Sequence, residues 1–500
     1  MRAPLLPLLL LLLLPPCLSS SLKSSLLSTA KSVPTRHVLG AKTANPDSDP
    51  LAPVTADELQ SFVQQIASAR RPVVLTGLQD AGVLTLMDLG SITAGAVLDN
   101  VRVQPDVEKS TFAIQRPPGE TAGSRASSAL DSSSSVGVIV PDESSLRHSV
   151  PAASLASASA DGLKYWTGGA EAYKNGEVLD SVLPEWRGLN VYDDLGVDVD
   201  DSVHVPMLWL SQPSVTAQTH YDKSHNLFVQ LAGTKEILLF PPSGGRFIYP
   251  FPSTHSGRKM SQLPLNEAVD EDAFANATSL AAYRVVLEEG QGLYIPPFWW
   301  HSIASLEASA SLSIVSPSWE EAHLARAEYT PLPLGGLEGA VARMMAAQTV
   351  LVHLISRVPS LGSPAVFSAF LHETRWVGLE GEGGEAGECF AGEEREEAER
   401  VADGWERDGS ELGAKLSEGA AEVAKMVNDE LVSNGLRMNF VGDYIEELSR
   451  WAVGQERTGR FIRDCLAYDN VEVAEMWDEQ TGIMEGLAGD PNRNPDGDEL

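Results

Sequence analysis

The sequence predicts a mainly β core, preceded by an α/β extension and followed by an α-helical region. Short apolar, β-branched segments closed by Gly and Pro recur between residues 203 and 316, and this pattern favours a sandwich or barrel. Residues 51–116 alternate between helix-like and strand-like stretches, of which residues 72–77 form the clearest strand. Helical periodicity returns only after Trp319.

The composition is that of a globular protein with enough length for more than one unit. Of the 500 residues, 36 are Lys or Arg and 69 are Asp or Glu, which gives a formal net charge of −33. This balance argues against binding to nucleic acid, because contacts to a polyanion need clustered cations. Three cysteines are too few for a disulfide scaffold.

The first twenty residues predict a secretory signal peptide, since one Arg precedes a Leu-rich stretch of about ten residues. Residues 21–50 then predict a linker or a transit-like segment, because residues 1–46 contain no acid. We therefore expect the secretory pathway, with the ER lumen favoured and a plastid of secondary origin or secretion as alternatives. Residues 497–500 resemble an ER-retrieval signal, and Asn276 begins a glycosylation sequon. No membrane span is expected after removal of the signal.

The remaining boundaries follow changes in composition. Residues 51–202 form the N-terminal part of the main module, with a disordered Ser- and Ala-rich insertion at 118–162. Residues 203–319 form its β core and 320–376 a helical extension. An acidic linker at 377–410 leads to a helical region at 411–489 and an acidic tail at 490–500.

Two helical stretches carry apolar stripes, one from Val341 to Val358 and one from Leu412 to Leu431. Such a stripe usually packs into the hydrophobic core of its own chain. The alternative is a homodimer interface formed by the C-terminal helices. Cys389 and Cys465 remain if the signal is removed, and the sequence leaves open whether they pair.

A candidate metal site lies within the β-rich segment. His220 and Asp222 are two residues apart on an extended stretch, so their side chains share one face. His301 ends the aromatic strand at 292–301 and completes two imidazoles and one carboxylate. This set leaves coordination positions of Fe(II) open for a cosubstrate and oxygen, whereas zinc more often takes further His or Cys.

The residues around this triad carry a family resemblance. Residues 220–222, 226–228, 240–242 and 293–301, together with Lys235, resemble a JmjC-type, cupin-like 2-oxoglutarate oxygenase of the small protein-hydroxylase branch. The resemblance covers 203–319 strongly and 51–202 more weakly. It implies a double-stranded β-helix, the cupin or jelly-roll fold, and a dioxygenase that uses Fe(II), 2-oxoglutarate and O2.

By this resemblance, His220, Asp222 and His301 hold iron, and Lys235 pairs with the distal carboxylate of 2-oxoglutarate. Further cosubstrate contacts are assigned to Asn226, Thr216, Thr219 and Ser316, although the usual threonine position holds Ala217. Beyond the metal centre no catalytic residue is assigned. The aromatic residues of the last motif are expected either to wall the pocket or to form core: Tyr294, Phe298, Trp299 and Trp300.

The substrate is expected to be a protein or peptide side chain that becomes hydroxylated, and demethylation is disfavoured. Lys259 and Met260 stand where the asparagine hydroxylase of this branch grips its target amide, and Met cannot donate a hydrogen bond. One rival is a catalytically silent cupin-fold scaffold of the secretory pathway. Another is a cupin enzyme that uses its metal without 2-oxoglutarate, which Lys235 argues against.

Overall fold

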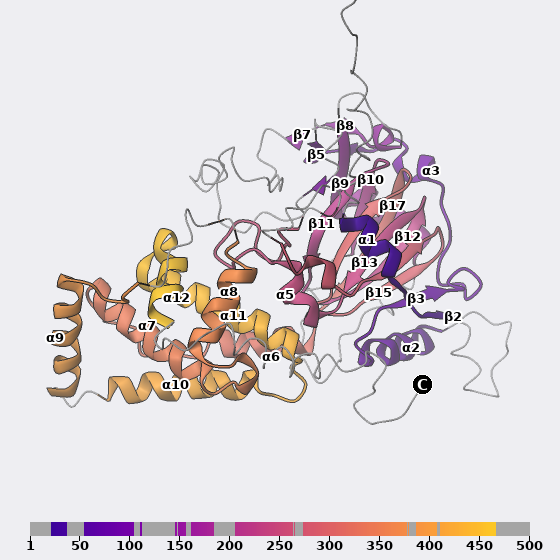
Figure 1. Cartoon of the computed structure of the whole chain (residues 1–500). Coiled ribbons are helices and arrows are strands. Elements are labelled where there is room, and N and C mark those ends of the chain that lie inside the picture. The colour runs from indigo at the N-terminus through magenta and orange to yellow at the C-terminus, as the bar shows by residue number, and fades with distance from the viewer. Residues whose placement is uncertain are drawn as a thin grey trace, which may run out of the picture.

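The computed structural model describes residues 22–37, 55–104, 111–112, 146–147, 149–156, 162–184, 206–263, 265, 274–377, 379, 387–407 and 411–466. A β-rich part and a bundle of helices lie side by side (Figure 1). Two sheets and a short strand pair make up the β-rich part. The predicted fold class, a β core of the cupin type with an α/β extension and a helical C-terminal region, is confirmed.

The larger sheet has nine strands, and their order crosses the sequence repeatedly. In spatial order they are β2 (Thr35–His37), β3 (Val73–Thr76), β15 (Gly292–Ile295), β12 (His225–Ala232), β17 (Ser309–Ser316), β10 (Met207–Ser211), β9 (Leu163–Gly169), β5 (Val101–Gln104) and β7 (Leu146–Arg147). Every residue of β12 is buried, because one face turns to the opposite sheet and the other to helices.

The smaller sheet has six strands and carries most of the candidate site. In spatial order they are β1 (Lys31–Ser32), β14 (Tyr283–Leu287), β13 (Lys235–Phe240), β16 (Trp300–Ser305), β11 (Thr216–Tyr221) and β6 (Thr111–Phe112). A separate pair joins β4 (Val97–Leu98) to β8 (Val150–Pro151). Apolar residues of both sheets, including Phe228, Ile237 and Leu293, pack against one another in one cluster.

Helices cover the outer face of the larger sheet. The covering helices are α2 (Ala56–Ser68), α3 (Leu89–Thr93) and α4 (Glu177–Val182). Helix α2 begins at a capping box in which Thr55 and Glu58 satisfy each other's backbone amides. Its Leu59 and Val63 pack into the same cluster as Leu227 and Val229 of β12.

The C-terminal part is a bundle with its own core. Its helices are α6 (Trp319–Glu328), α7 (Ala340–Ile355), α8 (Pro364–Thr374), α9 (Glu393–Arg407), α10 (Leu412–Val427), α11 (Asn434–Val453) and α12 (Thr458–Leu466). The apolar stripes of α7 and α10 are buried against each other and against α11, as the core interpretation requires. The homodimer stays a prediction.

Part of the segment expected to be a linker or transit-like is folded. Residues 22–37 form α1 (Leu22–Thr29), β1 and β2, and the two strands pair in parallel with β14 and β3. Leu22 and Leu26 are buried beside Phe240 and Trp300. The prediction was wrong here because a short helix needs only two apolar anchors, which a Ser-rich composition conceals.

Part of the segment expected to be an acidic linker is also ordered. Residues 393–407 form α9, and Trp405 packs on the core of the bundle. Just before α9, Cys389 is joined to Cys465 of α12 in a disulfide with a Cα–Cα distance of 4.5 Å. Two arginines pair with acids of this segment, Arg395 with Glu388 and Arg457 with Glu394.

Other predicted segments lie mostly outside the described residues. This holds for the signal peptide at 1–20, the tail at 490–500, the chain after Leu466 and most of the insertion at 118–162. Residues 149–156 of that insertion form β8 and a short helix with buried Ala152 and Leu155, so this part is not disordered. Within the part of the chain that the structure describes, no helix is long and apolar enough to cross a membrane.

The loop 249–263 lies between β11 and the helical bundle. On one side its backbone bonds to β11, where Lys259 accepts from the Tyr221 amide at 3.2 Å. On the other side the Ser253 amide donates to Glu446 of α11 at 2.6 Å. Arg375, which follows α8, pairs with Glu446 and Asp443 of α11. The loop therefore links β11 to the bundle.

Candidate metal centre

Three metal-binding side chains converge where β11 and β16 pair. His220 of β11 lies directly opposite His301 of β16, and Asp222 follows the end of β11. One ligand atom of each residue lies within 4.8 Å of the other two. Among the described residues, no fourth His, Cys, Asp or Glu joins the group. Two imidazoles and one carboxylate with open positions suit Fe(II) better than a closed zinc site.

Hydrogen bonds fix the tautomers of both imidazoles. Nδ1 of His220 lies 2.8 Å from the Gln218 carbonyl, and Nδ1 of His301 lies 2.9 Å from the Trp299 carbonyl. A carbonyl only accepts, so each Nδ1 carries the proton and donates it. Each Nε2 is therefore left with a lone pair for a metal ion.

The charges of the triad also suit a cation. Burial, followed by the neighbouring His301, lowers the pKa of His220 to about 4, so the imidazole is neutral at pH 7. Burial alone would raise the pKa of Asp222, but His220, His301 and Lys259 together hold it below its usual value. At neutral pH a neutral His220 imidazole therefore lies beside the Asp222 carboxylate.

Asn226 of β12 orients the carboxylate. The Ser313 hydroxyl donates to Oδ1 of Asn226 at 2.8 Å. This leaves the amide nitrogen of Asn226 as the donor for its hydrogen bond with Asp222. Asn226 therefore bonds a metal ligand, and its predicted contact with the cosubstrate stays a prediction.

The triad opens into a cavity of about 320 Å³ between the two sheets, called the central cavity below. Five predicted site residues line it: His220, Asp222, His301, Lys235 and Asn226. The rest of the lining is Tyr165, Thr167, Met207, Trp209, Leu210, Ser211, Val215, Ala217, Phe228, Ile303, Ser305, Ser313 and Val315.

Lys235 is a buried cation in the wall of this cavity. The residue is 4% exposed, and its Nζ lies 5.2 Å from the centre of the Phe228 ring. No carboxylate of the described residues lies within ion-pair distance of its ammonium group. Burial lowers the pKa of Lys235 to about 7. A buried ammonium without a counter-charge is costly, so the cavity is built for an anionic ligand.

A chain of serine hydroxyls stands beside Lys235. Ser305 of β16 is its direct cross-strand neighbour. The Ser305 hydroxyl lies 2.7 Å from that of Ser211, which lies 2.9 Å from that of Ser309. Such a chain can present one polarised hydroxyl to an anion. These serines were not among the predicted site residues, although serines at alternate positions 309, 311 and 313 of one strand indicate a polar inner face.

Three predicted cosubstrate contacts do not reach the central cavity. Thr216, Thr219 and Ser316 are buried, but none of them lines it. A bulge between Ala217 and His220 turns those two residues to the cavity and leaves both threonines out of its lining. From β17, Ser313 and Val315 line the cavity, and Ser316 does not. The family resemblance assigned Thr216 and Thr219 by their positions in the sequence, and such an assignment does not predict a bulge in the strand.

The four aromatic residues of the last motif belong to the hydrophobic core and not to the cavity wall. Tyr294 donates to the Ala67 carbonyl of α2 at 3.3 Å, and Phe298, Trp299 and Trp300 pack in hydrophobic clusters without lining the cavity. The aromatic residues that do line the cavity come from other strands: Tyr165, Trp209 and Phe228.

Two non-glycine residues with positive φ flank the triad. Lys259 has φ 66° and Phe298 has φ 61°. Both backbones bond next to the carboxylate ligand: the Phe298 amide donates to the Asp222 carbonyl at 2.7 Å, and the Lys259 carbonyl accepts from the Tyr221 amide at 3.2 Å. Left-handed backbone at non-glycine residues is costly and concentrates at functional sites.

Comparison with known proteins gives a consistent result. The family model described as the cupin-like domain matches residues 59–319, just over half of the chain. A lysine-specific demethylase, JMJ30 of Arabidopsis thaliana, is 37% identical over 105 residues, which is 21% of this chain and 24% of that protein. Jumonji C domain-containing protein 5 of Drosophila melanogaster is 31% identical over 107 residues, or 21% and 26%.

A tRNA wybutosine-synthesizing protein 5 of Mus musculus is 31% identical over 105 residues, which is 21% of this chain and 31% of that protein. The matched segments thus span 24–31% of the length of these three relatives. The extent of the family match, the two-sheet core and the His-Asp-His triad agree with one another. The chain belongs to the cupin-like family that includes the JmjC-domain proteins.

Proposed function

We propose that this chain is an Fe(II)- and 2-oxoglutarate-dependent oxygenase that hydroxylates a side chain of a protein or peptide. When bound, iron and 2-oxoglutarate supply the oxidation: one atom of O2 enters a substrate C–H bond, the other enters succinate, and CO2 leaves. A protein substrate is preferred over nucleic acid because of the net charge of −33.

One observation carries this proposal. Lys235 is a buried ammonium without a counter-charge in the described structure, and it lines the same cavity as the triad. A dicarboxylate that chelates the metal at one end and meets Lys235 at the other satisfies both features. Ser305, the cross-strand neighbour of Lys235, also lines the cavity, so its hydroxyl can donate to the same carboxylate.

The chain's own residues have distinct tasks in this reaction. The carbonyls of Gln218 and Trp299 hold the imidazoles in the metal-binding tautomer, and Asn226 orients Asp222. Apolar residues of the lining keep water from the reacting centre: Met207, Val215, Ile303 and Val315.

The test follows succinate produced from 2-oxoglutarate by the purified full chain with Fe(II) and ascorbate. Uncoupled turnover is expected, and His220→Ala and Asp222→Ala should each abolish it. Direct binding of 2-oxoglutarate to Mn(II)-loaded protein is measured alongside, since a missing substrate can silence uncoupled turnover. Succinate formation that persists in both variants would refute the site.

The scaffold alternative rests on the absence of Thr216, Thr219 and Ser316 from the central cavity. A silent cupin core has no use for a buried cation opposite a metal site, which favours the oxygenase. The two functions differ in one measurement. If 2-oxoglutarate fails to bind the metal-loaded chain, the scaffold function replaces the enzyme.

We also propose that the chain acts in the secretory pathway, with the ER lumen favoured. The Cys389–Cys465 disulfide supports an oxidising compartment, and Asn276 of the sequon is exposed. Expression of the tagged chain in eukaryotic cells should give a product whose mobility shifts after endoglycosidase treatment. An Asn276→Gln variant should show no shift, and an unglycosylated wild-type chain would count against this location.

A further inference from the structure

A second cavity lies at the junction between the β-rich part and the helical bundle. Its volume is about 210 Å³, and it shares no lining residue with the central cavity. It is called the junction cavity below. The lining residues that decide its chemistry are Pro242, Arg246, Phe247, Phe370, Gly435 and Asn439.

Both parts of the chain form the walls of the junction cavity. On the β side, the chain leaves β13 and passes directly into a 3-10 turn (Pro242–Gly244) and α5 (Gly245–Ile248). On the bundle side, α8 supplies Phe370, and the first turns of α11 supply residues between 434 and 439. Helix α11 contacts the 3-10 turn, and α8 contacts α5. An occupant of the cavity would therefore touch both parts of the molecule.

The N-terminus of α11 lies at this cavity. A Cβ at Gly435 would lie 2.3 Å from the carbonyl carbon of Pro242, so the helix approaches the 3-10 turn backbone to backbone. The Ser433 cap accepts from the Leu436 amide, and the preceding amides of Asn434 and Gly435 have no acceptor among the described residues. The start of a 20-residue helix carries a partial positive charge, which favours an anion.

Asn439 brings a buried amide without a partner to the same wall. The residue is 7% exposed, and its Nδ2 has no hydrogen-bond partner among the described residues. A buried polar group in this state costs stability, and an acceptor from a ligand offsets that cost. The terminal torsion of an asparagine side chain is broad, so the amide can turn Nδ2 toward an occupant. Asn439 is thus a donor for which the described structure supplies no acceptor.

Arg246 determines the sign of the charge at the cavity. Among the described residues that line it, Arg246 alone is charged. Its guanidinium carbon lies 4.3 Å from the centre of the Phe247 ring. Stacking on a ring orients the planar guanidinium, whose N–H groups match the two oxygens of a carboxylate. The cavity therefore favours an anion, although the formal net charge of the chain is −33.

The rest of the wall is mostly apolar and limits the size of an occupant. Pro241, Pro242, Phe370 and Met438 contribute to it. An apolar cavity of about 150 Å³ can hold benzene, whereas pockets for drug-sized ligands measure about 300–1,000 Å³. At about 210 Å³, the junction cavity suits one ring or a short chain together with one carboxylate.

We propose that the junction cavity is a binding site for a small carboxylate with an apolar body. The carboxylate meets Arg246, the Asn439 amide and the N-terminus of α11, and the apolar body packs on Phe247 and Phe370. This site is separate from the metal centre, so the inference does not depend on the oxygenase function. Because the occupant touches both parts of the molecule, its binding stabilises their contact.

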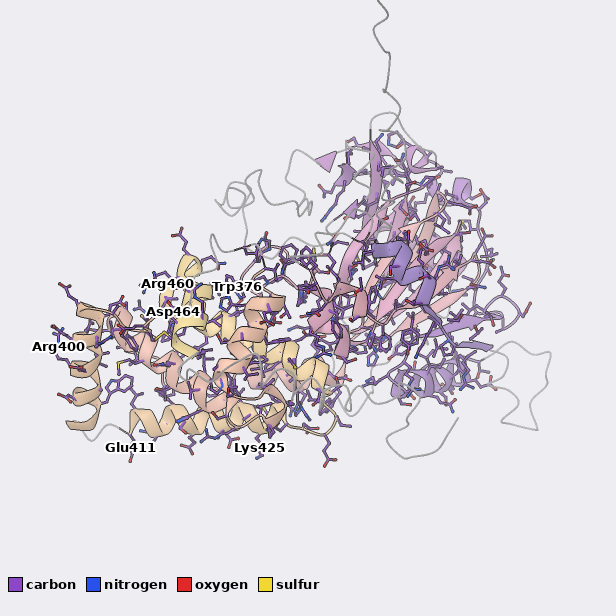
Figure 2. All side chains as sticks on the ribbon, in the orientation of Figure 1. Trp376, Arg400, Glu411, Lys425, Arg460 and Asp464 are labelled. Atoms are coloured by element: carbon purple, nitrogen blue, oxygen red, sulfur yellow. A yellow bond between two sulfur atoms is a disulfide. The ribbon has the colours of Figure 1, made fainter. Side chains whose placement is uncertain are left out.

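The test uses phenylacetate as the probe and measures its binding to the full chain by titration calorimetry. We expect Kd below about 1 mM, and phenylacetamide, a neutral analogue of the same shape, should bind at least tenfold more weakly. Arg246→Met should weaken phenylacetate binding at least tenfold and remove the preference for the carboxylate. The matched control is Arg400→Met, the same change on the exposed side of α9 at the end of the bundle farthest from the β-rich part (Figure 2). This control should keep Kd within twofold of wild type.

Asn439→Leu separates a role in binding from a role in folding. Leucine has a similar size and leaves no amide unpaired, so the thermal midpoint of the free chain should stay equal or rise. Kd for phenylacetate should nevertheless rise at least threefold. A lower midpoint with an unchanged Kd would show that Asn439 is only structural and would remove it from the site.

Lys235→Met locates the bound probe. It removes the cation of the central cavity and leaves the junction cavity intact, so Kd for phenylacetate should equal that of wild type. Loss of binding in Lys235→Met would place the probe in the central cavity and overturn the inference. No binding by wild type, or equal binding of phenylacetate and phenylacetamide, would overturn it as well. Failure of the proposed oxygenase function appears instead as a loss of 2-oxoglutarate binding, with phenylacetate binding unchanged.

Discussion

The burial of Lys235 has a measurable effect on the stability of the free chain. Burial lowers its pKa from 10.5 to about 7, so the folded chain binds fewer protons than the unfolded chain between these pH values. The free energy of unfolding therefore rises with pH across this window, and the cost of the buried ammonium is fully present below pH 7. By the usual conversion this cost is about 5 kcal/mol.

Lys235→Met should accordingly stabilise the free chain while it destroys cosubstrate binding. We expect a higher thermal midpoint than wild type at pH 6–7, with a difference that disappears toward pH 10.5. Binding of 2-oxoglutarate should weaken more than 100-fold. Thermal scans at several pH values check the first effect and titration calorimetry the second. A variant that is less stable than wild type at pH 7 would mean that the ammonium has a partner in the free protein.

Ser305 permits an independent test of the same end of the cavity. Ser305→Ala removes one hydrogen bond to a charged carboxylate, which is worth roughly 1.5–3 kcal/mol, so Kd for 2-oxoglutarate should rise about 10- to 100-fold. Kd for 2-oxopentanoate, which lacks the distal carboxylate, should not change. Ser316→Ala is the matched control, because that hydroxyl does not line the cavity. Equal losses for both ligands would place Ser305 away from the carboxylate.

Among the elements, the segment 22–37 contributes more than its length suggests. Its two strands extend one edge of each sheet, and α1 covers the outer face of the smaller sheet. Lys23 also pairs with Glu236 of β13 at 2.9 Å, and Arg284 pairs with the same carboxylate at 2.8 Å. The segment thus stabilises the strand that presents Lys235.

Leu26→Ala tests this contribution. Leu26 is 1% exposed, so its truncation leaves a cavity beside Phe240 and should cost about 2–5 kcal/mol of unfolding free energy. Ser28→Ala on the exposed side of the same helix should change stability by less than about 0.5 kcal/mol. Urea denaturation measures both. An unchanged midpoint for Leu26→Ala would mean that α1 does not pack on the sheet in solution.

At the scale of the whole molecule, the disulfide joins residues that are 76 positions apart and encloses α9, α10 and α11. Cys465→Ser should lower the stability of the helical bundle by about 2–4 kcal/mol. Cys389→Ser should do the same, and neither variant should respond to a reducing agent. Thermal midpoints with and without reductant check this. A wild-type midpoint that is insensitive to reductant would show that the cross-link adds no stability.

Sequence alone could suggest the triad from the spacing of His220 and Asp222 and from the histidine that ends the aromatic strand, whereas Lys235 and Asn226 were predicted from the family resemblance. Sequence could not predict Ser305 or Trp209 as wall residues, because Ser305 meets Lys235 only through the pairing of β13 with β16, and Trp209 lies on β10 in the opposite sheet from the triad. The folded segments 22–37 and 393–407 were hidden for another reason. Their composition is Ser-rich or Glu-rich, and a few buried anchors decide their structure.

The contact between Tyr221 and the helical bundle bears on how this protein can be divided in the laboratory. Tyr221 stands between the two metal ligands of β11, and its ring meets Trp300 edge-on while its hydroxyl donates to Asp443 of α11 at 3.4 Å. Gly442 leaves the space that Arg375 needs to reach Asp443. A recombinant fragment ended at residue 319, where the family match stops, would strip this backing from the metal strand. A fragment that keeps this contact must therefore extend at least through α11.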